Sequence, residues 1–151
     1  MKIPNLAALA DLKDKPLGPS EWVTITQDMI NAFSMATLDD QWIHTDVARA
    51  KKESPFGTPI AHGFLSLSLL SYLVQQLIEV ESAKMGLNYG LNKVRFTSHV
   101  PAGSRVRLRA KLIALEPYQA SGAKMTIEGI MEREGSEKPV CVAEFLGLIF
   151  E

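Results

Sequence analysis

Two polar side chains in the first third of the chain have the residue types of an acid–base pair. Asp39 and His44 lie five positions apart, and a carboxylate and an imidazole can together handle a water molecule and its protons. Further along, the run Ile60–Gly63 leads into a long apolar segment. Backbone amides at a helix start can receive a negatively charged oxygen, such as the enolate oxygen of a thioester. The pattern is what hydration of a conjugated thioester requires.

The spacing of Asp39 and His44 restricts how they can meet. In a continuous α-helix, positions i and i+5 point roughly 140° apart, so these two side chains could not converge on one water. We therefore expect the chain to leave a helix near Leu38, and the polar run Asp39–Gln41 favours a turn there. The pair alone is a weak signal, because a polar surface loop also accounts for it.

The bulk properties describe an ordinary globular chain. It has 151 residues, 46% of them hydrophobic, and a formal net charge of −1, so we expect no nucleic acid or membrane as a partner. The single Cys141 excludes an intrachain disulfide and favours a reducing compartment, and its apolar neighbours indicate a buried thiol. The start of the chain lacks a signal-peptide pattern, and the apolar segment 64–78 is too short and polar to span a bilayer. We expect a cytoplasmic protein.

Hydrophobic periodicity predicts helices first and strands afterwards. A short strand over 21–25 precedes a helix capped by Thr26 and reaching about Ala36, and a second helix spans 46–52. The segment from His62 to about Glu81 is helical and apolar nearly all round, which predicts a buried helix. A period of two then predicts strands. We expect them over residues 89–99, 105–112, 123–134 and 138–150.

This order predicts an α+β fold in which an antiparallel sheet packs on one helix. The chain has no repeats, low-complexity tracts or linkers, so residues 1–151 are expected to form one domain.

The two motifs taken together resemble a known family. The segment Phe33–His44, followed by Ile60–Gly63, resembles the MaoC-like dehydratases, the R-specific enoyl-CoA hydratases of hot-dog fold. Within that family the run Asp39–His44 looks most like the nodulation-protein-N-like branch. The resemblance covers nearly the whole chain, including the segments Asn92–Phe96 and Val100–Ser104.

The resemblance implies a hot-dog fold, a long antiparallel sheet wrapped around the central helix and paired into a homodimer or larger assembly. It implies reversible syn hydration of trans-2-enoyl thioesters, with coenzyme A or acyl carrier protein as part of the substrate and no other cofactor. The family's catalytic aspartate and histidine fall on Asp39 and His44. The glycine whose amide holds the thioester oxygen falls on Gly63, and a serine found in some members falls on Ser71.

Three positions depart from the family's pattern. Leu38 stands where a glycine is usual, and Gln41 and Trp42 stand where Asn-Pro is usual. The amide of Gln41 can still bond a carboxylate or water, whereas Trp42 is bulkier than proline and could narrow the pocket or pack at an interface. These changes bear on substrate size and rate more than on the chemistry.

The remaining polar residues have competing interpretations. We expect His62 to be structural or to line the substrate pocket, and His99 to be a packed or surface residue. No metal is implied, because the three histidines lack the usual ligand spacings. The basic strand face over 105–111 could meet the phosphates of coenzyme A, although a solvated face is the simpler account.

Two other functions remain open. One is a catalytically silent protein that binds acyl thioesters, and the other is a hot-dog thioesterase. The Asp39/His44 spacing with Ala61–Gly63 favours a hydratase over a thioesterase. The changes at Leu38, Gln41 and Trp42 lie in the site itself, so a catalytically silent binding protein remains an alternative.

Overall fold

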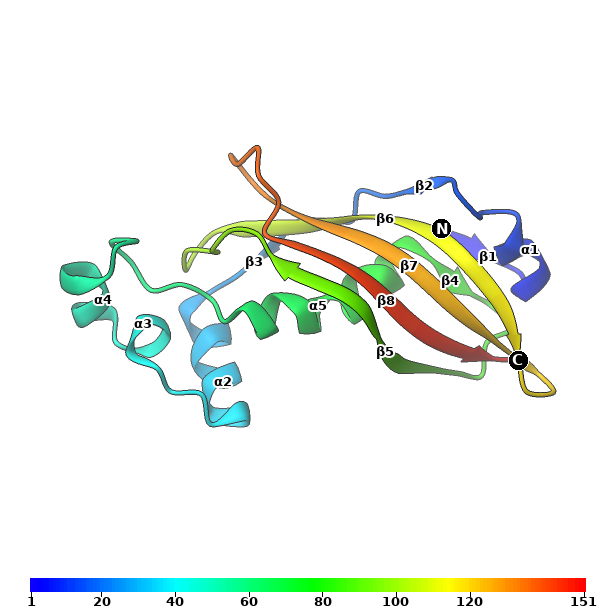
Figure 1. The fold of residues 1–151 in the computed structure, drawn as a ribbon, viewed down its shortest axis with the longest axis horizontal. Coiled ribbons are helices and arrows are strands. Elements are labelled where there is room, and N and C mark those ends of the chain that lie inside the picture. The colour runs from blue at the N-terminus through cyan, green and yellow to red at the C-terminus, as the bar shows by residue number, and fades with distance from the viewer.

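Four long antiparallel strands form the body of the protein in a computed structural model that describes residues 1–151 (Figure 1). Their spatial order is β6–β7–β8–β5, and two short strands, β2 and β3, pair with the free side of β6. The bounds are β2 (Pro16–Leu17), β3 (Val23–Thr24), β5 (Met85–Phe96), β6 (Arg105–Tyr118), β7 (Gly122–Arg133) and β8 (Cys141–Phe150). The alternation predicted for β6 is confirmed, because Val106, Leu108 and Leu112 are all fully buried.

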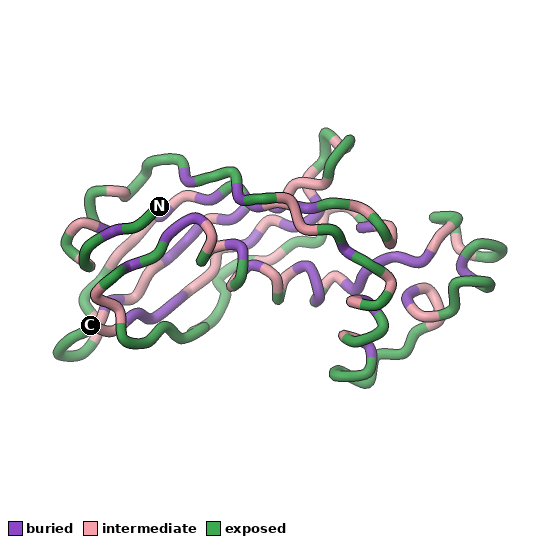
Figure 2. The backbone as a smooth tube through the Cα atoms, turned by 180° about the vertical axis from the view of Figure 1, so that it is seen from behind, coloured by how far each residue is buried: buried purple, intermediate pink, exposed green.

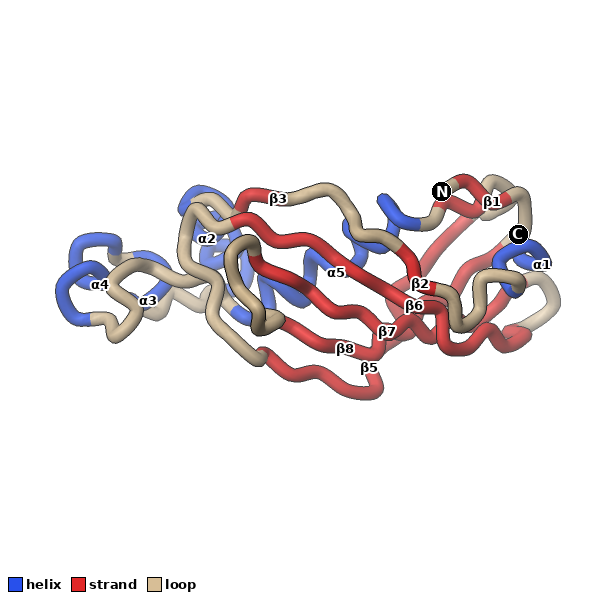
Figure 3. The backbone as a smooth tube through the Cα atoms, turned by 90° about the horizontal axis from the view of Figure 1, so that it is seen from above, coloured by secondary structure: helices blue, strands red, loops and turns tan.

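Helix α5 (Gly63–Leu77) lies along one face of this sheet, as the view from above shows (Figure 3). Its side chains Leu65, Leu70, Leu73 and Leu77 are buried and join a core cluster of 24 residues with the inward-facing side chains of the strands. The expected α+β hot-dog arrangement, a sheet around a central helix, is therefore present. The helix is not buried all round, because Phe64 and Tyr72 are 67% and 53% exposed.

The predicted end of the central helix at Glu81 was wrong. The helix stops at Leu77, and Ile78 already has extended backbone angles. Residues Glu79–Val80 form β4, which pairs in parallel with β1 (Lys2–Ile3). The branched side chains of Ile78 and Val80 favour extended backbone, and the pairing with β1 is a tertiary contact that periodicity does not report.

The other strand predictions hold with shifted ends. β5 begins four residues earlier than expected and ends at Phe96, whereas β8 begins at Cys141 because the turn before it extends through Pro139. β3 is shorter than the predicted strand over 21–25.

Three of the four helices that precede α5, namely α2, α3 and α4, extend beyond one end of the sheet (Figure 1). Helix α2 (Gln27–Thr37) is capped by Thr26, whose side chain accepts a hydrogen bond from the Met29 amide as predicted. Helix α4 (Val47–Glu53) is capped by Asp46. The short helix α3 (Trp42–Thr45) between them was not predicted, and it carries His44.

The N-terminal segment also holds structure that periodicity did not reveal. Helix α1 (Leu6–Ala10) is capped by Asn5 and places Leu9 in the core. Figure 2 shows burial concentrated in the sheet and α5, with mostly exposed backbone over α2–α4. None of the helices combines the length and apolar character needed to cross a bilayer.

Candidate active site

A left-handed turn presents Asp39 at the end of α2. Leu38 caps the helix with a φ of 63°, in the left-handed region, so the chain leaves the helical path where the Asp39/His44 spacing required. This conformation suits glycine and is unfavourable for most other residues. Leu38 therefore occupies a backbone conformation that favours glycine, and the residue is 87% exposed.

His44 is buried and held by a backbone carbonyl. Its Nδ1 lies 2.6 Å from the Ile60 carbonyl oxygen, which can only accept, so Nδ1 carries the hydrogen. The same segment is fixed from the other side, because the Ile60 amide donates to the Ile43 carbonyl at 3.1 Å. When the ring is neutral, its Nε2 is left with a free lone pair, which is the form that can accept a proton.

His62 contacts both His44 and the turn that carries Asp39. Its ring stacks on His44 with centroids 3.8 Å apart, and Phe33 packs against it at 5.0 Å. Its Nε2 donates to the backbone oxygen of Asp39 at 3.0 Å. The side chain is 2% exposed, and its Nδ1 is buried without a partner. His62 thus ties the start of α5 to the turn that presents Asp39.

Ligand-type atoms of Asp39, His44 and His62 all lie within 4.8 Å of one another. Such a trio is compatible in residue type with a bound metal ion. However, Nδ1 of His44 and Nε2 of His62 already bond backbone oxygens, which leaves one ring nitrogen on each of two stacked rings for any ligand. The geometry favours proton chemistry over metal ligation.

Burial sets the protonation state of His44. Removal from water lowers the pKa of this histidine below its ordinary value of 6.5, and the bond to Ile60 opposes that shift only in part. The neighbouring His62 lowers the pKa of His44 further, and the Asp39 carboxylate raises it. His44 is therefore neutral near pH 7 and ready to act as a base.

The start of α5 offers unpaired amides. The His62 side chain makes no capping bond, and the amides of Gly63 and Phe64 donate to no protein group. Gly63 is also tightly packed, since a Cβ there would lie 2.8 Å from the ring of Phe96. The φ of Gly63 is not in the left-handed region. The close packing of the Phe96 ring therefore explains the glycine better than backbone conformation does.

One cavity connects His44 with Gly63. Its volume is about 330 Å³, and its lining includes His44, Phe56, Gly63, Ser66, Phe96 and His99. Ser66 is 3% exposed and belongs to this lining. Sequence reasoning missed Ser66 as a site residue, although its position one helical turn after Gly63 places both on one face of α5. His99, packed 4.4 Å from Phe56, has a place in this lining that no local pattern indicated.

Two predicted site residues lie outside this cluster. Gln41 is exposed at the start of α3 and makes no side-chain hydrogen bond, and only its backbone oxygen supports His44. Ser71 lies two turns further along α5, where its hydroxyl donates to Asn88 at 3.0 Å. Trp42 packs under Arg49 at 4.3 Å and does not line the His44 cavity.

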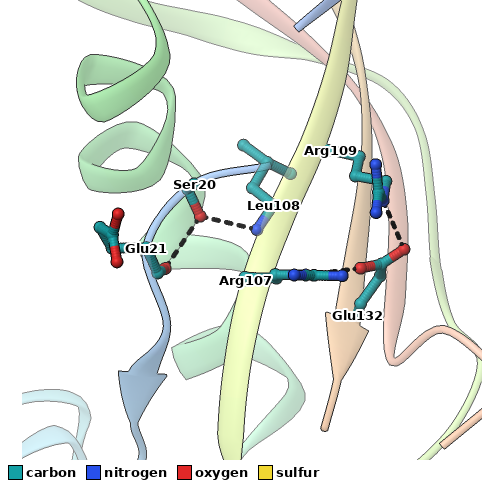
Figure 4. Close-up of polar contacts among 6 residues, drawn as sticks. All are labelled: Ser20, Glu21, Arg107, Leu108, Arg109 and Glu132. Carbon is teal, nitrogen blue, oxygen red and sulfur yellow. Dashed lines mark hydrogen bonds and ion pairs between the residues drawn. The ribbon is translucent and has the colours of Figure 1, made fainter. Parts of the chain in front are cut away.

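The three arginines on the basic face of β6 are neutralised within the sheet. Arg107 and Arg109 both donate to Glu132 at 2.8 Å (Figure 4). Arg105 pairs with Glu134. These pairs lower the pKa of Glu134 and, against the opposing effect of its burial, that of Glu132. The observed pairing supports a solvated strand face over a phosphate-binding one.

Comparison with known proteins places the chain in a family. The MaoC-like domain matches residues 9–132, so the chain belongs to the MaoC-like dehydratase domains. It is 49% identical over 140 residues to 3-hydroxyacyl-thioester dehydratase Z of Mycobacterium tuberculosis strain H37Rv, covering 93% of this chain and 92% of that one.

Two further relatives extend the comparison. Nodulation protein N of Rhizobium leguminosarum bv. viciae is 44% identical over 146 residues, covering 94% of this chain and 91% of that one. The structure of the R-hydratase PhaJ1 from Pseudomonas aeruginosa superposes with a TM-score of 0.67 at 21% identity, covering 87% and 79% of the two chains. At 21% identity, the similarity to the R-hydratase structure shows a shared fold only.

Proposed function

We propose that the protein is an R-specific enoyl-thioester hydratase that also catalyses the reverse dehydration of 3-hydroxyacyl thioesters. One observation carries the proposal: the Asp39 carboxylate lies within 4.8 Å of a ring nitrogen of neutral His44, and His44 lines a cavity that also includes Gly63 at the uncapped start of α5. The relationship to a 3-hydroxyacyl-thioester dehydratase at 49% identity supports the same reaction.

The geometry accounts for both halves of the addition. A water held between the Asp39 carboxylate and Nε2 of His44 gives its oxygen to C3 of the substrate while one of the two groups takes its proton. Charge then develops on the thioester oxygen, which the Gly63 and Phe64 amides stabilise. A proton returned from the same pair to C2 completes the addition on one face.

Cavities along α5 offer room for the acyl chain. Beyond the His44 cavity, a cavity of about 310 Å³ and one of about 550 Å³ follow in order along the helix, both lined by Ser71. The larger one is mostly apolar, with side chains of Val74, Ile78 and Leu148 in its wall. We assign the acyl chain to this row of cavities, which gives Ser71 a place in substrate binding away from the chemistry.

The reaction needs no cofactor apart from the carrier of the thioester. Addition of water is balanced without an oxidant or reductant, and coenzyme A or acyl carrier protein enters as part of the substrate. We also retain the proposal of a cytoplasmic location, which rests on the lone cysteine.

Thioester hydrolysis is less well supported. A hot-dog thioesterase would use a carboxylate to hydrolyse the thioester bond, and the buried Cys141, whose thiol pKa is raised to about 11, offers no second nucleophile at neutral pH. A silent thioester-binding protein would not require an imidazole held in the tautomer that frees Nε2. Neither alternative gives a function to the acid–base geometry of Asp39 and His44.

We propose that two copies pair along β5. This strand is bonded only to β8, and its other edge is open. Large apolar side chains of β5 are 41–54% exposed: Met85, Leu87, Tyr89, Leu91 and Phe96. An open apolar edge of this length is normally covered. Sedimentation at micromolar concentration should give a dimer or larger species, and a stable monomer would contradict the pairing.

The activity is tested directly with crotonyl-CoA and longer trans-2-enoyl-CoAs. Hydration removes the conjugated double bond, so absorbance of the conjugated thioester should fall only when the protein is present. Unchanged absorbance, with unchanged free thiol, would favour the silent protein. Release of free thiol would favour the thioesterase.

A further inference from the structure

His62, the residue before α5, contacts both members of the proposed acid–base pair. Its ring stacks on that of His44 with centroids 3.8 Å apart, and its Nε2 donates to the backbone oxygen of Asp39 at 3.0 Å. It is not one of the residues that line the His44 cavity. An influence of His62 on the reaction therefore passes through its neighbours and not through contact with the substrate.

The ring of His62 is itself held in place. Phe33 of α2 packs against it with centroids 5.0 Å apart, and the residue is 2% exposed. Its backbone oxygen accepts from the amides of Leu65 and Ser66 at 3.1 and 3.3 Å, which fixes it to the first turn of α5. A side chain locked by packing and by backbone bonds can hold another group in a defined position. His62 thus connects the central helix rigidly to the turn after α2.

The two groups that His62 contacts have few other supports. Asp39 is exposed and follows a residue with left-handed backbone. His44 lies in the four-residue helix α3, and its carbonyl oxygen accepts from the Gln27 side chain at 2.7 Å. The bonds of His44 to Gln27 and Ile60 fix the histidine, but neither of them contacts Asp39. His62 adds a direct link between the His44 ring and the residue that carries the carboxylate.

One nitrogen of His62 is buried without a partner. Because the Asp39 carbonyl can only accept, Nε2 carries the hydrogen, and Nδ1 of the neutral ring is an acceptor that bonds nothing. A buried polar atom without a partner costs stability, and such atoms are expected where function sets the orientation of a side chain. An apolar side chain would leave no such atom in this place. The unpaired Nδ1 therefore favours a role in the site over a role in packing.

We propose that His62 is a positioning residue, which holds the ring of His44 and the turn of Asp39 at the separation needed to share one water. The inference rests on the proposed function, in which both groups act on that water. Displacing a reacting group by about 1 Å can lower a rate about 10²-fold, so loosening either contact should lower kcat. KM should change much less, because His62 does not line the cavity.

Three substitutions separate the two contacts of His62. His62→Gln keeps an N–H donor at nearly the reach of Nε2 but has no ring, whereas His62→Phe keeps a ring that can stack but has no donor. His62→Leu has neither. In hydration of crotonyl-CoA we expect kcat to fall about 10²-fold in His62→Leu and less in the other two variants. Wild-type kcat in His62→Leu would overturn the proposal. Equal losses in all three would also overturn it, because they would follow from the missing imidazole and not from either contact.

Phe33→Leu is the matched control for lost packing. Phe33 packs against His62, but it does not line the His44 cavity. Its substitution should lower the melting temperature, as the loss of a packed ring does, and should leave kcat within a few-fold of wild type. If Phe33→Leu lowered kcat as much as His62→Leu does, the effect would come from general loosening, and the proposal would be wrong.

Nitrogen-15 nuclear magnetic resonance of the three histidines tests the contacts without turnover. In the neutral wild-type protein we expect the hydrogen of His62 on Nε2 and that of His44 on Nδ1, because each faces a backbone oxygen. The opposite tautomer of His62 would exclude its bond to Asp39 and overturn the proposal even if hydration proceeds.

The same spectra follow the pKa of His44 and keep this proposal separate from the hydratase proposal. Burial lowers that pKa most, the Ile60 bond and the Asp39 carboxylate raise it, and His62 lowers it. His62→Gln removes the titratable neighbour, so the pKa of His44 should rise, and the acid limb of kcat/KM should move to higher pH with it. An unchanged pKa would overturn the proposed contact between the rings. A raised pKa in a protein without turnover would support the contact and remove the hydratase.

Discussion

The helical region over residues 26–63 and the sheet formed by β5–β8 are built in different ways. The sheet is held by long registers of backbone pairs and by fully buried side chains such as Leu108 and Ile127. The helical region is mostly exposed, and single contacts fix its functional groups, such as the bonds of His44 to Ile60 and of His62 to Asp39. The comparison teaches that stability resides in the sheet and chemistry in the turns at its end.

Breaking the acid–base pair should have the largest effect on activity. Asp39→Asn and His44→Ala should each lower turnover about 10²–10⁴-fold, because each removes a general acid–base group. The melting temperature of Asp39→Asn should change little, since Asp39 is exposed. Steady-state hydration of crotonyl-CoA and thermal unfolding, measured on the same samples, check both statements. Near wild-type turnover in both variants would remove these residues from the mechanism.

A substitution in the sheet should show the opposite pattern. Leu108→Ala removes a fully buried side chain that packs beside Gly129 and Leu70, and should lower the free energy of unfolding by about 2–5 kcal/mol. Turnover at low temperature should stay within a few-fold of wild type. Denaturant unfolding gives the first quantity. A loss of turnover as large as that of His44→Ala, in protein that is still folded, would erase the distinction between the two regions.

Gly63 lies where the two regions meet, so its substitution tests both. Gly63→Ala should cost up to about 10²–10³ in turnover if its amide holds the thioester oxygen. The added Cβ also meets the ring of Phe96, so some stability should be lost as well. Combining it with Phe96→Leu relieves that contact and serves as the control. Recovery of melting temperature without recovery of turnover is expected, whereas recovery of both would reduce Gly63 to a packing role.

The pH dependence should follow His44. Because burial places its folded-state pKa below 6.5, the ring stays neutral to lower pH than a free histidine. We expect kcat/KM to be flat near neutrality and to fall as the pH drops through that lowered pKa. An acid limb above pH 6.5 would contradict the assignment.

The same shift predicts a stability effect. The unfolded chain binds the His44 proton at a higher pH than the folded protein does, so this contribution to stability is complete above 6.5 and is lost as the pH falls through the folded-state pKa. His44→Ala should lack this part of the acid destabilisation, which urea titrations across pH 4–7 can measure against wild type.

The sequence predicted the elements whose pattern is local. The alternation in β6 and the Thr26 cap of α2 follow from neighbouring residues and were found in place. Helix α3 was missed because four residues give no periodicity, and the end of α5 was misplaced because β4 depends on pairing with the distant β1.

The candidate site divides in the same way. Asp39, His44 and Gly63 were found from spacing and family resemblance, and the turn at Leu38 from the geometry that this spacing requires. The contact of Gly63 with Phe96 was beyond reach, because it depends on segments far apart in the chain. Ser66 was within reach from its position one helical turn after Gly63.

The stereochemistry of hydration tests the central claim most directly, because the claim is that Asp39 and His44 act on one water from one side. Crotonyl-CoA hydrated in deuterium oxide should give the R-3-hydroxy product, with deuterium at C2 on the same face as the new hydroxyl group. Nuclear magnetic resonance of the product gives the relative configuration at C2 and C3, and chiral chromatography gives the absolute configuration at C3. Deuterium on the opposite face would contradict a shared water between these two residues, and an S product would contradict the R-specific assignment.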